Sequence, residues 1–66
     1  MQLLKRTEVI NWAKSMRKYR LVKSIEWVGI IELNGQEYVT ATSLQRIMQP
    51  KTFRQLTVDV TSYIFN

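Results

Sequence analysis

The chain has 66 residues with ten Lys and Arg, five Asp and Glu, and neither His nor Cys, so its net charge is +5. A chain this short forms one domain, residues 1–66, and buries only about 60% of the surface that its unfolded form exposes. Without Cys and His, disulfides and thiolate or imidazole metal sites are excluded. Dimerisation is therefore the main remaining way to enlarge a small core.

The composition also argues against catalysis and against a membrane protein. There is no His base and no Cys nucleophile, and the two glycines form neither a phosphate loop nor a nucleophile elbow. We therefore expect that the chain is not an enzyme and that it has no catalytic residue, no cofactor and no metal site. No run of about 18 apolar residues is present, and the stretch from Met1 to Arg6 lacks an apolar signal core. A cytoplasmic location is expected, in the host cell if the chain is encoded by a phage.

Apolar side chains recur at helical spacing in the first third of the chain. They are Val9, Trp12, Ala13, Met16 and Tyr19. This spacing predicts an amphipathic helix that begins at Glu8 and ends near residues 20–22, and it leaves open whether residues 7–23 form one helix or two. Lys14, Arg17 and Lys18 lie roughly opposite the apolar side, so the helix has one apolar and one basic face.

A β-hairpin is predicted in the middle of the chain. Ile25–Leu33 reads as a strand, Asn34-Gly35 is the favoured two-residue turn, and Gln36–Thr40 is the returning strand. This register pairs Ile31 with Tyr38 and sets Glu32 opposite Glu37, which is mildly destabilising. Either a base from elsewhere covers the two carboxylates, or they face open water.

The pattern of residues in the last third of the chain predicts a short helix and a strand. Leu44, Ile47 and Met48 form an apolar stripe that Pro50 ends, residues 51–55 fit one more helical turn, and Leu56–Phe65 reads as a strand. The expected fold class is α+β, with a three-stranded antiparallel sheet and helices on one side. The apolar terminal strand either pairs within this sheet or adds to a partner, which keeps a homodimer through this strand open.

Large apolar side chains at inward positions are interpreted as core. Trp12 and Trp27 lie on predicted inward faces, and core packing suits them better than base stacking. The same interpretation applies to Met16 and Met48.

The distribution of charge points to a polyanionic partner. Residues 1–23 hold seven of the ten Lys and Arg and a single acid, Glu8. Nucleic acid binds such surfaces because each phosphate that is neutralised releases condensed counterions, and Asn is a residue type that reads adenine. The alternative is that these bases complement a helix C-terminus and keep a small protein soluble. The candidate nucleic-acid-binding residues are Asn11, Lys14, Arg17, Lys18, Arg20, Lys23, Arg46, Lys51 and Arg54.

The segment Asn34-Gly35-Gln36-Glu37-Tyr38-Val39-Thr40-Ala41-Thr42-Ser43-Leu44 resembles two phage-type DNA-binding families. One is the excisionase group of small winged-helix proteins, in which two helices precede a β wing with a glycine turn and a short helix follows it. The other is the KilA-N domain, which has a similar junction between strand and helix. The resemblance implies a wing at residues 32–37 and favours DNA over RNA.

These observations predict a small basic DNA-binding protein, either a transcriptional regulator or a recombination accessory factor of a phage or mobile element. The first alternative is an inhibitor or adaptor module that binds a host protein, through the strand at Leu56–Phe65 or through the basic helix in an acidic groove. An RNA-binding protein is the second alternative.

Overall fold

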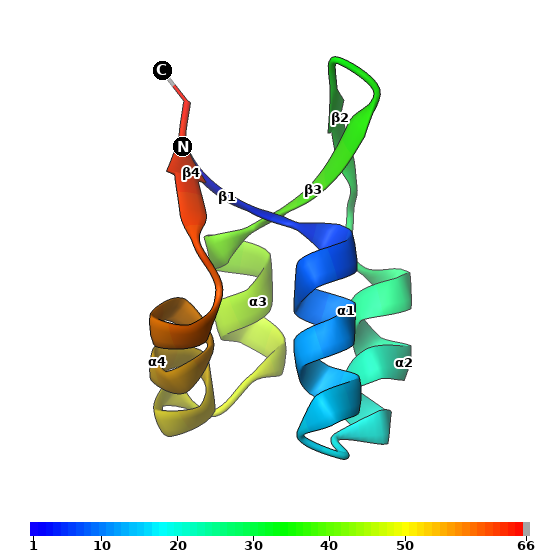
Figure 1. The fold of residues 1–66 in the computed structure, drawn as a ribbon, viewed down its shortest axis with the longest axis vertical. Coiled ribbons are helices and arrows are strands. Elements are labelled where there is room, and N and C mark those ends of the chain that lie inside the picture. The colour runs from blue at the N-terminus through cyan, green and yellow to red at the C-terminus, as the bar shows by residue number, and fades with distance from the viewer. Residues whose placement is uncertain (66) are drawn as a thin grey trace.

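A computed structural model describes residues 1–65 of the chain (Figure 1). Helices and strands are mixed along the sequence, so the α+β class is confirmed. The elements in chain order are β1 (Gln2–Lys5), α1 (Arg6–Ser15), α2 (Tyr19–Trp27), β2 (Ile31–Leu33), β3 (Gln36–Thr40), α3 (Ala41–Ile47), α4 (Pro50–Asp59) and β4 (Ser62–Ile64).

The sheet is antiparallel with the strand order β2-β3-β1-β4, so it has four strands where three were predicted. The additional strand, β1, is short and lies at the chain start, where no turn signal marks it. The two chain ends pair with each other: the amino group of Met1 donates to the carbonyl of Phe65 at 2.7 Å, and the Phe65 amide donates back at 2.9 Å. The helices lie on one side of the sheet, as predicted (Figure 1).

The predicted hairpin is confirmed. Asn34 and Gly35 have φ values of 52° and 78°, which a two-residue turn of this kind requires at both positions. Glu32 lies opposite Glu37, as the predicted register requires. A base from elsewhere approaches one of the two acids, because Arg6 Nη1 lies 3.8 Å from Glu37 Oε1, whereas Glu32 is exposed to water.

The predicted strand Ile25–Leu33 is wrong in its first half. Helix α2 continues to Trp27, and only Ile31–Leu33 is extended. Val22 and Ile25, three residues apart, are both buried, so a helix covers the core with them. Because Trp27 then falls on the outward side of α2, its side chain is 88% exposed, and its interpretation as core is wrong.

The predicted strand Leu56–Phe65 is also wrong in its first half. Helix α4 begins with Pro50 at its first position, as expected, but continues to Asp59. Leu56 is buried in the core from the inward side of α4, and this tertiary packing overrides the strand preference of the branched residues. Val60, the extended residue after the helix, is buried beside it. Only Ser62–Ile64 forms a strand at the chain end.

One apolar core lies between the sheet and the four helices. Trp12 and Met48 belong to it, as predicted, whereas Met16 is 46% exposed and its interpretation as core is wrong. Met16 falls at the end of α1, where the chain turns away from the core. Within residues 1–65, no helix combines the length and the apolar character that crossing a bilayer requires. The core residues are Leu4, Val9, Trp12, Ala13, Val22, Ile25, Val39, Ala41, Leu44, Met48, Leu56 and Val60.

Candidate nucleic-acid interface

Residues 7–23 belong to two helices that a three-residue turn joins. The Lys18 amide donates to the Ala13 carbonyl at 2.8 Å, and the Arg17 amide donates to the Lys14 carbonyl at 3.0 Å. This pair of bonds is the Schellman ending of a helix, in which one residue takes the left-handed conformation that glycine prefers. Here that residue is Arg17, with φ 57°. The turn therefore presents a long cationic side chain where an uncharged glycine is the usual choice.

A second junction lies between α3 and α4. Met48 and Gln49 are both extended, and Pro50 opens α4. Proline disfavours helical conformation in the residue before it, so α3 ends at Ile47 and α4 begins in a new direction. The junction places Lys51 near the start of α4, where its side chain is exposed.

Both junctions lie at the end of the molecule opposite the sheet (Figure 1). α1 and α3 end there, whereas α2 and α4 begin there. Bases late in α1 and α3, bases in the first turns of α2 and α4, and two bases near the middle of α2 and α4 are therefore brought to the same half of the molecule. We call this group the basic end. Its residues are Lys14, Arg17, Lys18, Arg20, Lys23, Arg46, Lys51 and Arg54.

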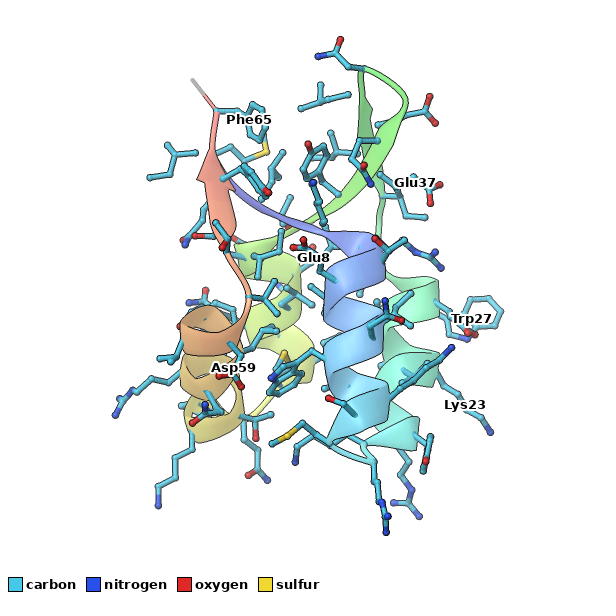
Figure 2. All side chains as sticks on the ribbon, in the orientation of Figure 1. Glu8, Lys23, Trp27, Glu37, Asp59 and Phe65 are labelled. Carbon is cyan, nitrogen blue, oxygen red and sulfur yellow. The ribbon has the colours of Figure 1, made fainter. Side chains whose placement is uncertain are left out.

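The acids follow the opposite pattern. Glu8 lies early in α1, Glu26 late in α2, and Asp59 is the last residue of α4, while the other two acids belong to the hairpin (Figure 2). Within residues 1–65 the single ion pair joins Arg6 to Glu37, beside the sheet. The cations of the basic end therefore have no carboxylate of the described chain within 4.0 Å.

An open hollow of about 630 Å³ lies between the two junctions. Arg17, Lys18 and Arg20 border it on one side, and Gln49 borders it on the other. Apolar side chains form part of its wall, so cations and an amide surround a partly apolar surface. The lining residues are Arg17, Lys18, Tyr19, Arg20, Leu21, Ile47, Met48, Gln49 and Thr52.

The other predicted bases lie around this hollow without lining it. Lys23 lies on α2, three residues beyond Arg20, and points away from the molecule (Figure 2). Arg54 lines a second hollow, of about 480 Å³, between α3 and α4. Arg46 is exposed in the last turn of α3. The structure therefore brings the predicted bases to one half of the molecule but not to one pocket.

Asn11 is separate from these bases. It lines a hollow of about 450 Å³ between α1 and the end of α4, together with Glu8 and Asp59. Trp12 Nε1 donates to Asp59 Oδ2 at 2.8 Å, and Gln55 Nε2 donates to Asp59 Oδ1 at 3.0 Å. These two hydrogen bonds, that from Trp12 first, lower the pKa of the Asp59 carboxyl below its usual value. Asn11 therefore lies beside negative charge rather than among the cations.

The outward face of α2 was not anticipated. At about 100° per residue, Arg20, Lys23 and Trp27 fall within about 60° of one another on the side opposite the buried Val22 and Ile25. A signal for the break before α2 is present in the sequence. In one continuous helix, Val22 and Ile25 would be about half a turn out of phase with the apolar residues of α1.

Comparison of the chain with known proteins yields no relative: no protein family, no curated protein and no solved structure matches it.

Proposed function

We propose that this chain is a small DNA-binding protein whose basic end contacts the phosphates of a duplex. The observation that carries the proposal is the segregation of charge. Eight of the ten bases lie in the half of the molecule opposite the sheet, and four of the five acids lie at or towards the sheet. The fifth acid, Asp59, lies beside Trp12 in the helical half (Figure 2). A surface of this kind binds nucleic acid by releasing the counterions condensed on its phosphates. Such a protein suits the role of a transcriptional regulator or recombination accessory factor of a mobile element.

The simpler explanation of these bases, that they stabilise helix ends, does not suit two of the four helix ends at the junctions. Cations are favourable at the C-terminal end of a helix and unfavourable at the N-terminal end. Lys14 and Arg46 do lie in the last turns of α1 and α3. Arg20 and Lys51, however, lie in the first turns of α2 and α4, which hold no acid. Helix stability does not account for bases at these two positions, whereas binding of an anion does.

The arrangement of α1 and α2 supports duplex DNA as the partner. Two helices joined by a short turn also occur in helix-turn-helix proteins, whose second helix enters the major groove. Here α1 and α2 run side by side in opposite directions (Figure 1), so the likeness is in the short turn and the order of the helices. The outward face of α2 offers Arg20 and Lys23 for that role. The β2–β3 hairpin and α3 follow in the order that the resemblance to excisionases implies, but the hairpin carries Glu32 and Glu37 and lies away from the basic end. Only the order of elements, and not a contact of the hairpin with DNA, supports the proposal.

Single-stranded RNA is less favoured, because recognition of unpaired bases uses aromatic rings that are free to stack. The rings of Tyr38, Tyr63 and Phe65 pack against one another, with centroids 5.5–6.4 Å apart. Trp27 and Tyr19 are the exposed exceptions. Trp27 lies on α2 beside Lys23, and Tyr19 borders the hollow between the two junctions. Both lie beside bases that suit the backbone of a duplex, and competition with single strands tests whether these rings stack on unpaired bases.

Fluorescence anisotropy with labelled duplex DNA at low salt tests the proposal. Arg20→Gln and Lys51→Gln each remove one exposed cation from a different junction, and we expect each to weaken binding several-fold. Lys5→Gln is the matched control, because it removes the same charge beside the sheet and is expected to leave affinity nearly unchanged. Competition with single-stranded DNA and RNA compares the three kinds of nucleic acid directly.

Two outcomes would overturn the proposal. One is the absence of binding to any duplex at low salt. The other is a loss of affinity in the Lys5→Gln protein equal to that of the two junction variants. Stronger competition by single-stranded RNA than by the duplex would replace DNA with RNA as the partner.

A further inference from the structure

Strand β4 (Ser62–Ile64) forms one edge of the sheet, and within residues 1–65 no strand pairs with its outer side. Native edges are usually guarded by charge, by proline or by a bulge. The opposite edge, β2, carries Glu32, but β4 has neither charge nor proline. Ile64 is 75% exposed at this edge. The edge is thus open and apolar.

The hydrogen bonds between the chain ends show which backbone groups of β4 face outwards. Met1 and Phe65 exchange two hydrogen bonds, so Phe65 directs its amide and carbonyl towards β1. Alternate residues of an antiparallel strand share this direction, and Tyr63, opposite Leu3, therefore does the same. Ser62 and Ile64 direct their amides and carbonyls to the open side.

We propose that a second copy of this chain pairs with β4 in antiparallel fashion around a two-fold axis at Tyr63. In this register Ser62 faces Ile64 of the second copy, and Ile64 faces its Ser62. Each of these pairs exchanges two hydrogen bonds, so the four outward groups of each copy are all satisfied. Tyr63 faces Tyr63 of the second copy across a pair without backbone hydrogen bonds, where side chains approach most closely.

The surroundings of Tyr63 favour a second copy over an unrelated strand. Its ring lies 5.9 Å from that of Tyr38, and Lys5 Nζ lies 5.5 Å from its centroid. Pairing around the two-fold axis joins this aromatic cluster to its symmetry mate and creates one continuous apolar strip on the outer face of the sheet. The cations of the basic end do not oppose the pairing, because they lie opposite the sheet (Figure 1). The cation that does approach the joined cluster is Lys5 of each copy, whose ammonium group lies over the Tyr63 ring.

The pairing is expected to be reversible. Two short strands bury less than the roughly 1,000 Å² of a stable interface, so dimers form as the protein concentration rises. Nucleic-acid binding is not required for this association.

Sedimentation equilibrium over a concentration series tests the pairing. We expect the mass of the wild-type chain to rise from 7.9 kDa towards twice that value. Ile64→Lys guards the edge with charge and should keep the chain monomeric. Val58→Lys is the matched control, because Val58 is also 75% exposed but lies on α4, and this variant should still dimerise. Circular dichroism establishes that both variants are folded.

A cysteine at Tyr63 tests the register in a chain that contains no other cysteine. Facing residues of a pair without hydrogen bonds have Cα atoms about 4.5 Å apart, within the range of a disulfide. Under mild oxidation, Tyr63→Cys should form a covalent dimer much faster than Val58→Cys. A wild-type chain that stays monomeric at every concentration, or equal cross-linking of the two cysteine variants, would overturn the proposal. The first result would leave the edge to a strand of another protein.

Discussion

Asp59 joins two helices through its side chain. Its two carboxylate oxygens accept hydrogen bonds from Trp12 on α1 and from Gln55 on its own helix. Both bonds favour the charged carboxylate, and they lower the pKa of Asp59 from its usual value of 3.8. The indole of Trp12 is buried, so this contact also gives its N–H group a partner.

The stability of the fold should therefore depend on the charge of Asp59. Because its folded pKa lies below the unfolded value, the carboxylate stabilises the fold above the unfolded pKa, and this contribution is lost as the pH falls through the folded pKa. Asp59→Asn should lower the urea midpoint at neutral pH, and its difference from wild type should shrink in acid. Urea unfolding from neutral pH down to about pH 2 measures this.

Glu26→Gln is the control for Asp59→Asn, because the Glu26 carboxylate accepts no hydrogen bond within residues 1–65. Its difference from wild type should stay small across the series. A difference between Asp59→Asn and wild type that stays the same from neutral pH to acid would contradict the role assigned to the charge.

At the scale of the elements, the turn between α1 and α2 has a cationic residue, Arg17, at a position where the backbone conformation favours glycine. Left-handed backbone at a residue other than glycine costs on the order of 1 kcal/mol, and Arg17 has this conformation. Strain of this kind is often kept where a side chain has a function. The side chain of Arg17 borders the hollow between the two junctions.

Arg17→Gly should accordingly separate stability from binding. We expect the free energy of unfolding to rise by about 1 kcal/mol, because glycine takes the left-handed conformation without strain. Affinity for duplex DNA should fall, because a cation leaves the basic end. Urea unfolding and anisotropy on the same preparation measure the two effects. A less stable protein, or one with unchanged affinity, would contradict this prediction.

The sequence predicts elements well where the signal is local. Asn34-Gly35 specifies its own turn, and the alternating residues on either side then fix the register of β2 and β3. Where tertiary packing decides, prediction fails. Residues 25–27 and 56–59 are rich in types that favour strands, but they are helical because Ile25 and Leu56 are buried on inward helix faces. Strand β1, one of the two inner strands, depends on partners more than thirty residues away.

The candidate site, too, could be predicted from the sequence only in part. Composition identifies the bases, but it does not show that they share one half of the molecule, because this depends on the direction of each helix. Lys51 and Arg20 are 31 positions apart in the sequence, yet both lie in the first turn of a helix at the basic end. Asn11 was grouped with the bases by its position on α1, and only the packing of α4 against that helix places it beside Asp59.

At the scale of the whole molecule, charge and fold are arranged along one axis. The sheet joins both chain ends and carries the acidic hairpin, and the two helix junctions carry the bases at the far end. A polyanion is attracted to one end and repelled by the other, so the net charge of +5 understates the attraction at the basic end. We therefore expect every bound molecule to face the DNA with its basic end.

The salt dependence of binding should count the bases that take part. Each phosphate contact contributes about −0.9 to the slope of log K against log salt concentration, so the eight bases of the basic end limit the slope to about −7. Arg46→Gln and Arg54→Gln should each make the slope shallower by about 0.9 if their side chains reach phosphates. Lys5→Gln, beside the sheet, should leave it unchanged. Anisotropy titrations at several salt concentrations give these slopes, and an equal change in all three variants would mean that the DNA does not recognise one end of the molecule.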